Sequence, residues 1–152
     1  MKSPITKHKL GQSISEFYGF DQKSKIPLSL FSCGVSAGFP SPADDYIGQQ
    51  LDLNDLLIKH PAATFFVRVA GDSMNGVGIN NNDILVVDRS LEPVHGKIII
   101  AAVNSELTVK RLIKTDISCQ LVAENPNYPP IEITEELSCV VWGVVTSVIH
   151  QF

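Results

Sequence analysis

From residue 64 onward the chain is a succession of short runs rich in β-branched residues, and this pattern limits the possible folds more than any other feature. Gly, Asn, Asp and Pro separate the runs every ten to fifteen residues. Short strands punctuated in this way are typical of a largely antiparallel, all-β fold. A short helix or turn is expected within residues 51–60, and Pro61 directly after this range ends it. We expect strands over residues 64–69, 83–88, 97–103, 107–113, 119–123 and 140–149.

The length and composition of the chain indicate an ordinary globular protein. A chain of 152 residues suits one compact domain with a tail, because domains cluster at about 100–150 residues. Hydrophobic residues make up 44% and charged residues 18%, which excludes wholesale disorder. No apolar run approaches the roughly 20 residues of a membrane helix, and residues 1–9 lack the apolar core of a secretory signal. We therefore expect a cytoplasmic protein without a membrane partner.

The cysteines argue against a disulfide framework and against a metal site. Cys33, Cys119 and Cys139 form an odd set that contains no C-x-x-C pair, and no histidine lies at the spacing of a zinc ligand. We interpret them as reduced thiols. Neither a metal nor another cofactor is expected.

The charge is distributed unevenly along the chain. The formal net charge is -4, but residues 1–37 carry five lysines against Glu16 and Asp21, so their net charge is +3 and residues 38–152 hold -7. An acidic body is a poor match for a polyanion, so direct, specific DNA binding is not expected. The pattern predicts a modestly basic, weakly structured arm in front of an acidic body.

The arm is expected to end at a domain boundary. The run Ile26 to Phe31 alternates in part and is consistent with an extended segment that pairs with a sheet edge, while Pro27 argues against a central strand. Residues 34–42 are dense in small and turn-forming residues. Such a stretch is typically exposed and easy to cut.

Ser73 and Lys110 suggest a serine nucleophile and a lysine base. A serine hydroxyl is a poor nucleophile at neutral pH, so it needs a proton acceptor within hydrogen-bond reach. Lysine can accept that proton only when it is neutral, and its ordinary pKa of about 10.4 must fall by several units. Burial among the apolar neighbours in its own expected strand is one way to achieve this.

The segment around Ser73 has the composition of a tight loop. It joins two expected strands, and Gly71 and Gly76 permit a backbone that presents the hydroxyl and its neighbouring amides. The backbone amides of Ser73 and Met74 are candidates to bind the oxyanion that develops during acyl transfer.

The residues alone leave other interpretations open. A Gly-Asp-Ser run is most often a polar loop, and a lysine on a strand is usually a solvated edge. A histidine-based triad would have to use His95 or His60, with Asp83 or Asp88 orienting the base. Only geometry identifies a triad, and a sequence does not contain that geometry.

Several segments taken together resemble the UmuD-like branch of the LexA-related, self-cleaving proteins. The likeness extends over about residues 37–150, and its Ser-Met and Val-Lys pairs are specific. The Gly-Phe-Pro-Ser-Pro stretch that begins at Gly38 separates UmuD-like chains from LexA proper. The segments that carry the resemblance are residues 38–46, 51–58, 71–74, 83–88, 95–98, 108–112 and 142–145.

The resemblance implies a fold and an activity. The fold is an all-β, β-clip-like peptidase domain of the LexA and signal-peptidase type, with an extended N-terminal arm. The activity is that of a serine endopeptidase that acts on its own chain, with Ser73 as nucleophile and Lys110 as neutral base. The family cuts before the glycine of Gly-Phe-Pro-Ser-Pro, which here is the bond Ala37–Gly38. The nearby Cys33–Gly34 bond is a less favoured alternative, because Phe-Pro does not follow it.

The resemblance also implies a role and partners. Cleavage would remove residues 1–37, expose surface that the arm covers, and leave residues 38–152 as the active form. That form would be an accessory subunit of the error-prone DNA polymerase V in the SOS response. The implied partners are a second copy of the chain in a homodimer, a RecA filament on single-stranded DNA as activator, and the UmuC-like catalytic subunit of the polymerase.

Two other functions remain as alternatives. The first is a non-catalytic, all-β interaction subunit, for which the serine hydroxyl would lie far from the lysine amine. The second is a self-cleaving repressor of the LexA or phage type that binds DNA. An arm of 37 residues is too short for a helix-turn-helix domain, and Pro4 and Pro27 would break its helices, which disfavours the repressor.

Overall fold

The computed structural model of the protein describes residues 9–10, 13–19, 28–31 and 47–152. The chain divides into two compact units, one formed by Met1–Phe20 with His60–Phe152 and the other by Asp21–Lys59. This division differs from the boundary expected after Ala37, which lies outside the described residues and stays a prediction.

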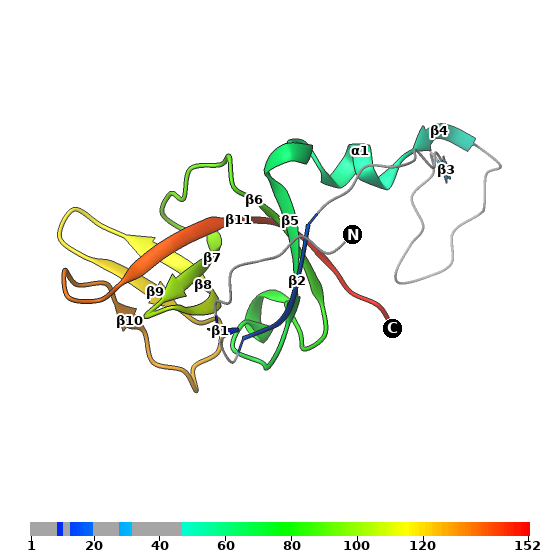
Figure 1. Ribbon diagram of the computed structural model, residues 1–152. Helices are drawn as coiled ribbons and strands as arrows, with labels where there is room; N and C mark the ends of the chain where they lie inside the picture. The colour runs from blue at the N-terminus through cyan, green and yellow to red at the C-terminus, as the bar shows by residue number, and fades with distance from the viewer. Residues whose placement is uncertain (1–8, 11–12, 20–27, 32–46) are drawn as a thin grey trace. The chain divides into compact units, whose positions relative to one another are not determined.

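The larger unit is built around a curled, nine-stranded sheet, so the expected all-β class is confirmed (Figure 1). Its order is β10-β9-β8-β7-β11-β6-β5-β2, and β1 pairs with β8. Every pairing is antiparallel except that of β1 with β8. The six expected strands are all present, with ends within one residue of those expected. The strands are β1 (Lys9–Leu10), β2 (Ile14–Gly19), β5 (Thr64–Val69), β6 (Ile84–Asp88), β7 (Ile98–Val103), β8 (Glu106–Lys114), β9 (Cys119–Val122), β10 (Ile131–Glu132) and β11 (Cys139–Ile149).

Strand β7 explains why the sheet has an apolar core on both faces. Successive side chains of a strand point to opposite faces. Ile100 and Ala102 enter one core cluster, while Ile99 and Ala101 enter the other. A continuous apolar run, rather than an alternating one, is therefore what this position in the sheet requires. The first cluster also contains Leu107 and Val109 of β8, and the second contains Leu112, Leu121 and Val144.

Strand β11 joins the two halves of the sheet. Its first half pairs with β7 and its second half with β6, and the register shifts between Val141 and Gly143 and again between Val145 and Ser147. Irregularities of this kind bend a strand and increase its twist. At Gly143 a Cβ would lie 2.7 Å from Cγ1 of Val87, so a glycine permits the close approach of the strands at the bend.

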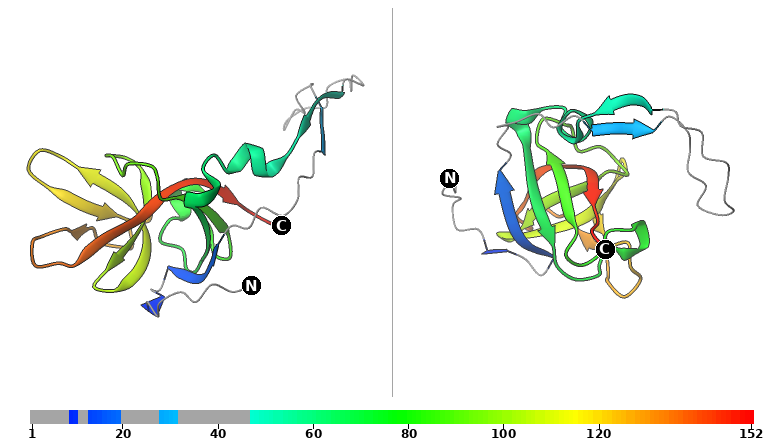
Figure 2. Two further views of the ribbon diagram at one scale, coloured as in Figure 1. Left: turned by 45° about the horizontal axis from the view of Figure 1, so that its top comes forward. Right: turned by 90° about the vertical axis from the view of Figure 1, so that its right-hand side faces the viewer.

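The N-terminal segment is more ordered than the sequence indicated. Strand β2 pairs antiparallel with β5, and β1 pairs parallel with β8. The segment therefore connects two strands that β7, β11 and β6 separate in the sheet order, and Figure 2 shows it in blue beside the sheet. The expectation of a weakly structured arm is wrong for residues 14–19. The side chain of Ile14, which is only 1% exposed, anchors this strand, although residues 14–19 show no clear apolar alternation in sequence.

The smaller unit contains a two-stranded antiparallel sheet and one short helix. Strand β3 (Leu28–Phe31) pairs with β4 (Ile47–Leu51), so the expected extended run finds a partner outside the large sheet. Helix α1 (Leu53–Leu57) is shorter than the range in which it was expected, and Asp52 caps it by accepting a 2.8 Å hydrogen bond from the amide of Asn54.

Further expectations concern the thiols and the membrane. Cys119 and Cys139 are free thiols, whereas Cys33 lies outside the described residues. Among the described residues, no helix has the length and apolar character needed to cross a membrane.

Candidate active site

The structure brings Ser73 and Lys110 together. The Nζ atom of Lys110 lies 3.2 Å from Oγ of Ser73, and each residue is only 6% exposed. Residues 71–73 do form a polar turn, in which Gly71 and Asp72 are exposed, but the Ser73 side chain is buried. Lys110 is not a solvated edge residue, so the ordinary interpretation of the lysine is wrong. The contact also contradicts a non-catalytic subunit in which the hydroxyl lies far from the amine.

The loop after β5 holds Ser73 by means of its neighbour Met74. The Met74 side chain is 1% exposed and belongs to the first core cluster. Its carbonyl accepts hydrogen bonds from the amides of Val77 and Ile79, both at 3.3 Å. The short 3-10 helix Asn75–Val77 follows directly. A buried side chain beside an exposed backbone turn fixes the direction in which the Ser73 hydroxyl points.

A second loop, over residues 124–129, supports the first from the other side. The amide of Gly76 donates a 2.8 Å hydrogen bond to the carbonyl oxygen of Glu124. A Cβ added at residue 76 would lie only 2.4 Å from that oxygen. The side-chain amide of Asn125 donates a 3.0 Å hydrogen bond to the carbonyl of Asp72. Glycine is therefore required at position 76 for the close approach of the two backbones.

Lys110 has three polar neighbours that suit a neutral amine. Its Nζ lies 3.0 Å from Oγ1 of Thr108 and 3.0 Å from the carbonyl oxygen of Val109, in addition to Ser73. Burial lowers the pKa of Lys110, because removal from water disfavours its charged form. A neutral amine has two N–H groups and one lone pair. Thr108 and Val109 can accept from the two N–H groups, which leaves the lone pair for the Ser73 hydroxyl.

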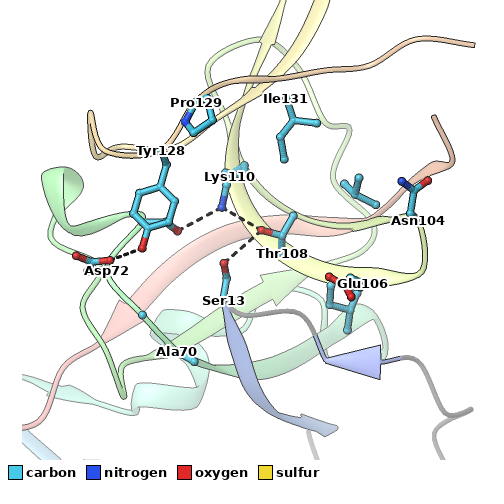
Figure 3. A pocket seen from close by; sticks show the side chains of 14 residues that line it. Ser13, Ala70, Asp72, Asn104, Glu106, Thr108, Lys110, Tyr128, Pro129 and Ile131 are labelled. Atoms are coloured by element: carbon cyan, nitrogen blue, oxygen red, sulfur yellow. Dashed lines mark hydrogen bonds between the residues drawn. The ribbon is translucent and has the colours of Figure 1, made fainter. Parts of the chain in front are cut away.

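Thr108 links the dyad to the N-terminal segment. With its oxygen accepting from Lys110, its own hydrogen is directed to Oγ of Ser13, at a longer distance of 3.4 Å. Figure 3 shows Ser13 and Lys110 on either side of Thr108. The amide of Ala70 donates a 2.8 Å hydrogen bond to the Ser13 carbonyl, which places Ser13 beside the loop that leads to Ser73.

A cavity of about 700 Å³ opens in front of the dyad, within the size range of binding sites for ligands. At one wall the Tyr128 hydroxyl donates a 2.6 Å hydrogen bond to Oδ1 of Asp72 (Figure 3). The cavity combines the polar groups of the dyad with apolar side chains such as Leu107 and Ile131. Its walls are Ser13, Ala70, Gly71, Asp72, Ser73, Val103, Asn104, Glu106, Leu107, Thr108, Lys110, Tyr128, Pro129 and Ile131.

The histidines considered for a triad have other partners. Nδ1 of His60 lies 2.6 Å from Oδ2 of Asp88, and Nδ1 of His95 accepts a 3.1 Å hydrogen bond from the amide of Lys114. Asp83 pairs with His150. None of these side chains lines the cavity, so the structure gives no support to a histidine triad.

Sequence reasoning missed four residues of the site. Thr108 follows from strand geometry, since it lies two positions before Lys110 and therefore on the same face of β8. Asp72, Tyr128 and Ser13 carry no comparable signal, because loops or the arm bring them to the cavity. Among the residues that the structure describes, no three His, Cys, Asp or Glu side chains form a group that could hold a metal ion.

An all-β body with a buried serine–lysine pair at the wall of a cavity defines the class of Ser-Lys peptidases. Comparison with known proteins agrees: a family model described as Peptidase S24-like matches residues 29–146. The chain belongs to the peptidase S24-like family, in its UmuD-like, LexA-related branch.

Relatives of this branch match most of the chain. Protein SamA of Salmonella typhimurium is 49% identical over 85% of this chain and 88% of its own length. Protein ImpA of Shigella flexneri is 48% identical over 80% and 83% of the two chains. Protein MucA of Escherichia coli is 43% identical over 88% and 90%. The resemblance found in the sequence is thus confirmed, and the protein is a self-cleaving serine peptidase of the SOS mutagenesis response.

Proposed function

We propose that the chain cuts its own Ala37–Gly38 bond, with Ser73 as nucleophile and Lys110 as general base. The observation that carries the proposal is the buried 3.2 Å contact between the hydroxyl and the amine. The bond lies outside the described residues and is assigned from the resemblance of its Gly-Phe-Pro-Ser-Pro stretch to the cut site of UmuD-like chains; the small residues that flank the attacked carbonyl agree with this choice.

The reaction proceeds by proton transfer and acyl transfer. Nζ of Lys110 takes the proton of the Ser73 hydroxyl as Oγ attacks the carbonyl carbon of Ala37. The tetrahedral intermediate then expels the amine of Gly38, which receives the proton from Lys110. This leaves residues 1–37 esterified to Ser73. Water, activated by the neutral Lys110, hydrolyses the ester and regenerates the dyad.

The oxyanion needs hydrogen-bond donors as it forms. We assign this role to the backbone amides of Ser73 and Met74. In acyl-transfer enzymes a donor of this kind lowers the barrier by about 3 kcal/mol. The burial of Met74 supports the assignment, since it holds the turn that carries both amides. The arrangement requires no metal or cofactor.

The cut form, residues 38–152, acts in this proposal as an accessory subunit of a translesion polymerase. Relatives from the SOS mutagenesis response support this role. The partners that we propose are a second copy of the chain, a RecA filament on single-stranded DNA as activator, and the UmuC-like catalytic subunit of polymerase V. The cytoplasm is the compartment in which these partners meet. Repression of the LexA type is disfavoured, because the described part of the arm forms strands β1, β2 and β3.

One experiment tests the bond, the chemistry and the activator together. Purified protein is incubated at mildly alkaline pH, with and without RecA filaments, and the products are analysed by N-terminal sequencing and denaturing mass spectrometry. A fragment beginning at Gly38 is expected from the wild type, and none from Ser73→Ala or Lys110→Ala. A product beginning at Gly34 would move the cut to the alternative bond. An intact wild-type mass after long incubation with filaments would refute the proposal.

A further inference from the structure

The N-terminal segment contributes to the hydrophobic core of the body. Ile14 is 1% exposed and lies in the first core cluster together with Val67 and Leu107. An Ile side chain this deeply buried is typical of a permanent strand of a sheet rather than of a loosely attached tail. The core of the larger unit is therefore incomplete without residue 14.

Backbone pairing reinforces this attachment. Strand β2 pairs with β5 from Ile14 opposite Val69 to Gly19 opposite Phe65, and β1 pairs with β8. The carbonyl of Ser13 extends the pairing by accepting from the amide of Ala70. Because β5 would otherwise be an edge strand, β2 satisfies hydrogen-bonding groups that would be open to any other extended peptide.

The solvent side of β2 adds a specific contact. Oε2 of Glu16 lies 2.7 Å from Nε of Arg68, and the Tyr18 hydroxyl donates to the same carboxylate oxygen at 2.5 Å. Tyr18 is exposed and the Glu16–Arg68 pair is half-buried at the surface, so salt weakens their attraction. They fix the register of the strand, while Ile14 anchors it in the core.

We propose that cleavage nicks the protein without freeing the arm, and that strands β2 and β1 stay bound to β5 and β8, respectively, without a covalent link to the body. This rests on the proposed cut at Ala37–Gly38, which lies well after β2 in the sequence and breaks no contact of that strand. Release of the arm is then a second, separate step. It uncovers the edge of β5, the site of Ile14 and the cavity wall at Ser13.

The two steps respond to different conditions. Before the cut the arm is tethered, so its effective concentration at β5 is in the millimolar range typical of short linkers. After the cut the arm is lost only through dissociation, which dilution promotes. An extended peptide that competes for the edge of β5 promotes it as well. Cleavage therefore prepares the body for exposure, and strand release completes it.

The test follows the arm after self-cleavage of the full-length chain. Denaturing mass spectrometry measures the cut, and native mass spectrometry or gel filtration measures whether residues 1–37 remain with residues 38–152. We expect the wild-type arm to stay bound at micromolar protein. Ile14→Asp should raise the dissociation rate at least about tenfold, since it places a charge at the buried anchor. The matched control is Ser15→Asp, an exposed neighbour on the same strand, which should retain the arm.

A second preparation separates this inference from the proposed activity. In the Ser73→Ala chain, residues 34–37 are replaced by the recognition sequence of a site-specific protease, and that protease makes the nick. If the wild type fails to cut itself, the proposed activity fails, whereas the nicked Ser73→Ala chain still reports on retention.

Hydrogen exchange provides a measurement that does not depend on Ile14→Asp folding. In a nicked chain whose β2 carries no substitution, the amides of β2 should exchange at rates within about tenfold of those in the uncut chain. Loss of that protection upon nicking, or dissociation of the unaltered arm as fast as that of Ile14→Asp, would overturn the proposal.

Discussion

The Tyr128 hydroxyl donates a 2.6 Å hydrogen bond to Oδ1 of Asp72, the residue directly before Ser73. Together with the hydrogen bond from Asn125 to the Asp72 carbonyl, it ties the loop over residues 124–129 to the loop that carries the serine. The same hydrogen bond raises the pKa of Tyr128, so the tyrosine stays protonated at the mildly alkaline pH at which cleavage is measured.

Replacement of Tyr128 by Phe should therefore affect cleavage more than folding. The ring remains, but the tie to Asp72 is lost, and we expect the rate of self-cleavage to fall about three- to tenfold. The midpoint of thermal unfolding should barely change, since the bond is exposed. Asp72→Asn is the matched control, because its amide oxygen can still accept from Tyr128. An unchanged cleavage rate in Tyr128→Phe would show that the tie plays no part in positioning Ser73.

The cleavage rate should rise with pH and then level off. Only neutral Lys110 accepts the Ser73 proton, so well below the pKa of Lys110 the rate should increase about tenfold per pH unit. Burial lowers this pKa from its ordinary value of 10.5, and the plateau should therefore begin below pH 10.5. Gel-based rates of self-cleavage across the alkaline range measure it. A rise that continues unbroken to pH 10.5 would mean that the amine is solvated.

Burial of Lys110 should also appear in the stability of the protein. The unfolded chain keeps the lysine proton up to about pH 10.5, while the folded chain releases it earlier, so wild-type stability should increase with pH between these two pKa values. Each unit by which the pKa is lowered corresponds to about 1.4 kcal/mol. Lys110→Met has no lysine to titrate, so this increase of stability with pH should be absent from the variant. We expect Lys110→Met to be more stable than wild type at neutral pH, and this difference should shrink as the pH approaches 10.5.

Urea unfolding at several pH values makes this comparison. Lys114→Met, an exposed lysine on the same strand, is the control and should leave the slope unchanged. The carbonyl of Val109 loses a partner in Lys110→Met, which reduces the absolute gain. The decisive quantity is therefore the pH dependence of the difference. If the free energies of unfolding of wild type and Lys110→Met changed in parallel with pH, the lowered pKa of Lys110 would be contradicted.

Gly76→Ala should damage both stability and activity. Its Cβ would lie 2.4 Å from the Glu124 carbonyl oxygen, a backbone atom that cannot rotate away. We expect a loss of about 2–4 kcal/mol in the free energy of unfolding and a fall of at least tenfold in cleavage, since relief of the clash moves the Ser73 loop. Gly19→Ala, where a Cβ meets nothing within 4 Å, serves as the control. Comparable behaviour of the two variants in urea unfolding would refute the steric argument.

The sequence predicts those parts of the fold in which side-chain pattern alone decides the structure. The apolar run in β7 and its neighbours identifies buried strands, because few other environments tolerate so many β-branched residues together. Strand β2 escapes detection, since its sequence lacks a clear apolar alternation and its partner β5 lies some fifty residues away in the chain. Local pattern carries no information about so distant a partner.

The candidate site, too, contains some residues that the local sequence reveals and others that only the folded structure shows. Ser73 and Lys110 are recognisable because their chemistry is unusual and their neighbours match a known family. Thr108 can be predicted from the sequence, because side chains two residues apart in a strand lie on the same face. The contacts of Tyr128 with Asp72 and of Ser13 with Thr108 join separate segments across 56 and 95 positions of the chain, so only the folded structure shows them.

The two bends in β11 have a mechanical consequence for the dyad. Ser73 follows β5, in the half of the sheet that β6 attaches to β11, whereas Lys110 belongs to β8, in the half that β7 attaches to the same strand. The dyad therefore bridges the two halves of the sheet that share this one strand. We expect the curvature near Gly143 to influence how the hydroxyl and the amine are aligned, although Gly143 itself does not line the cavity.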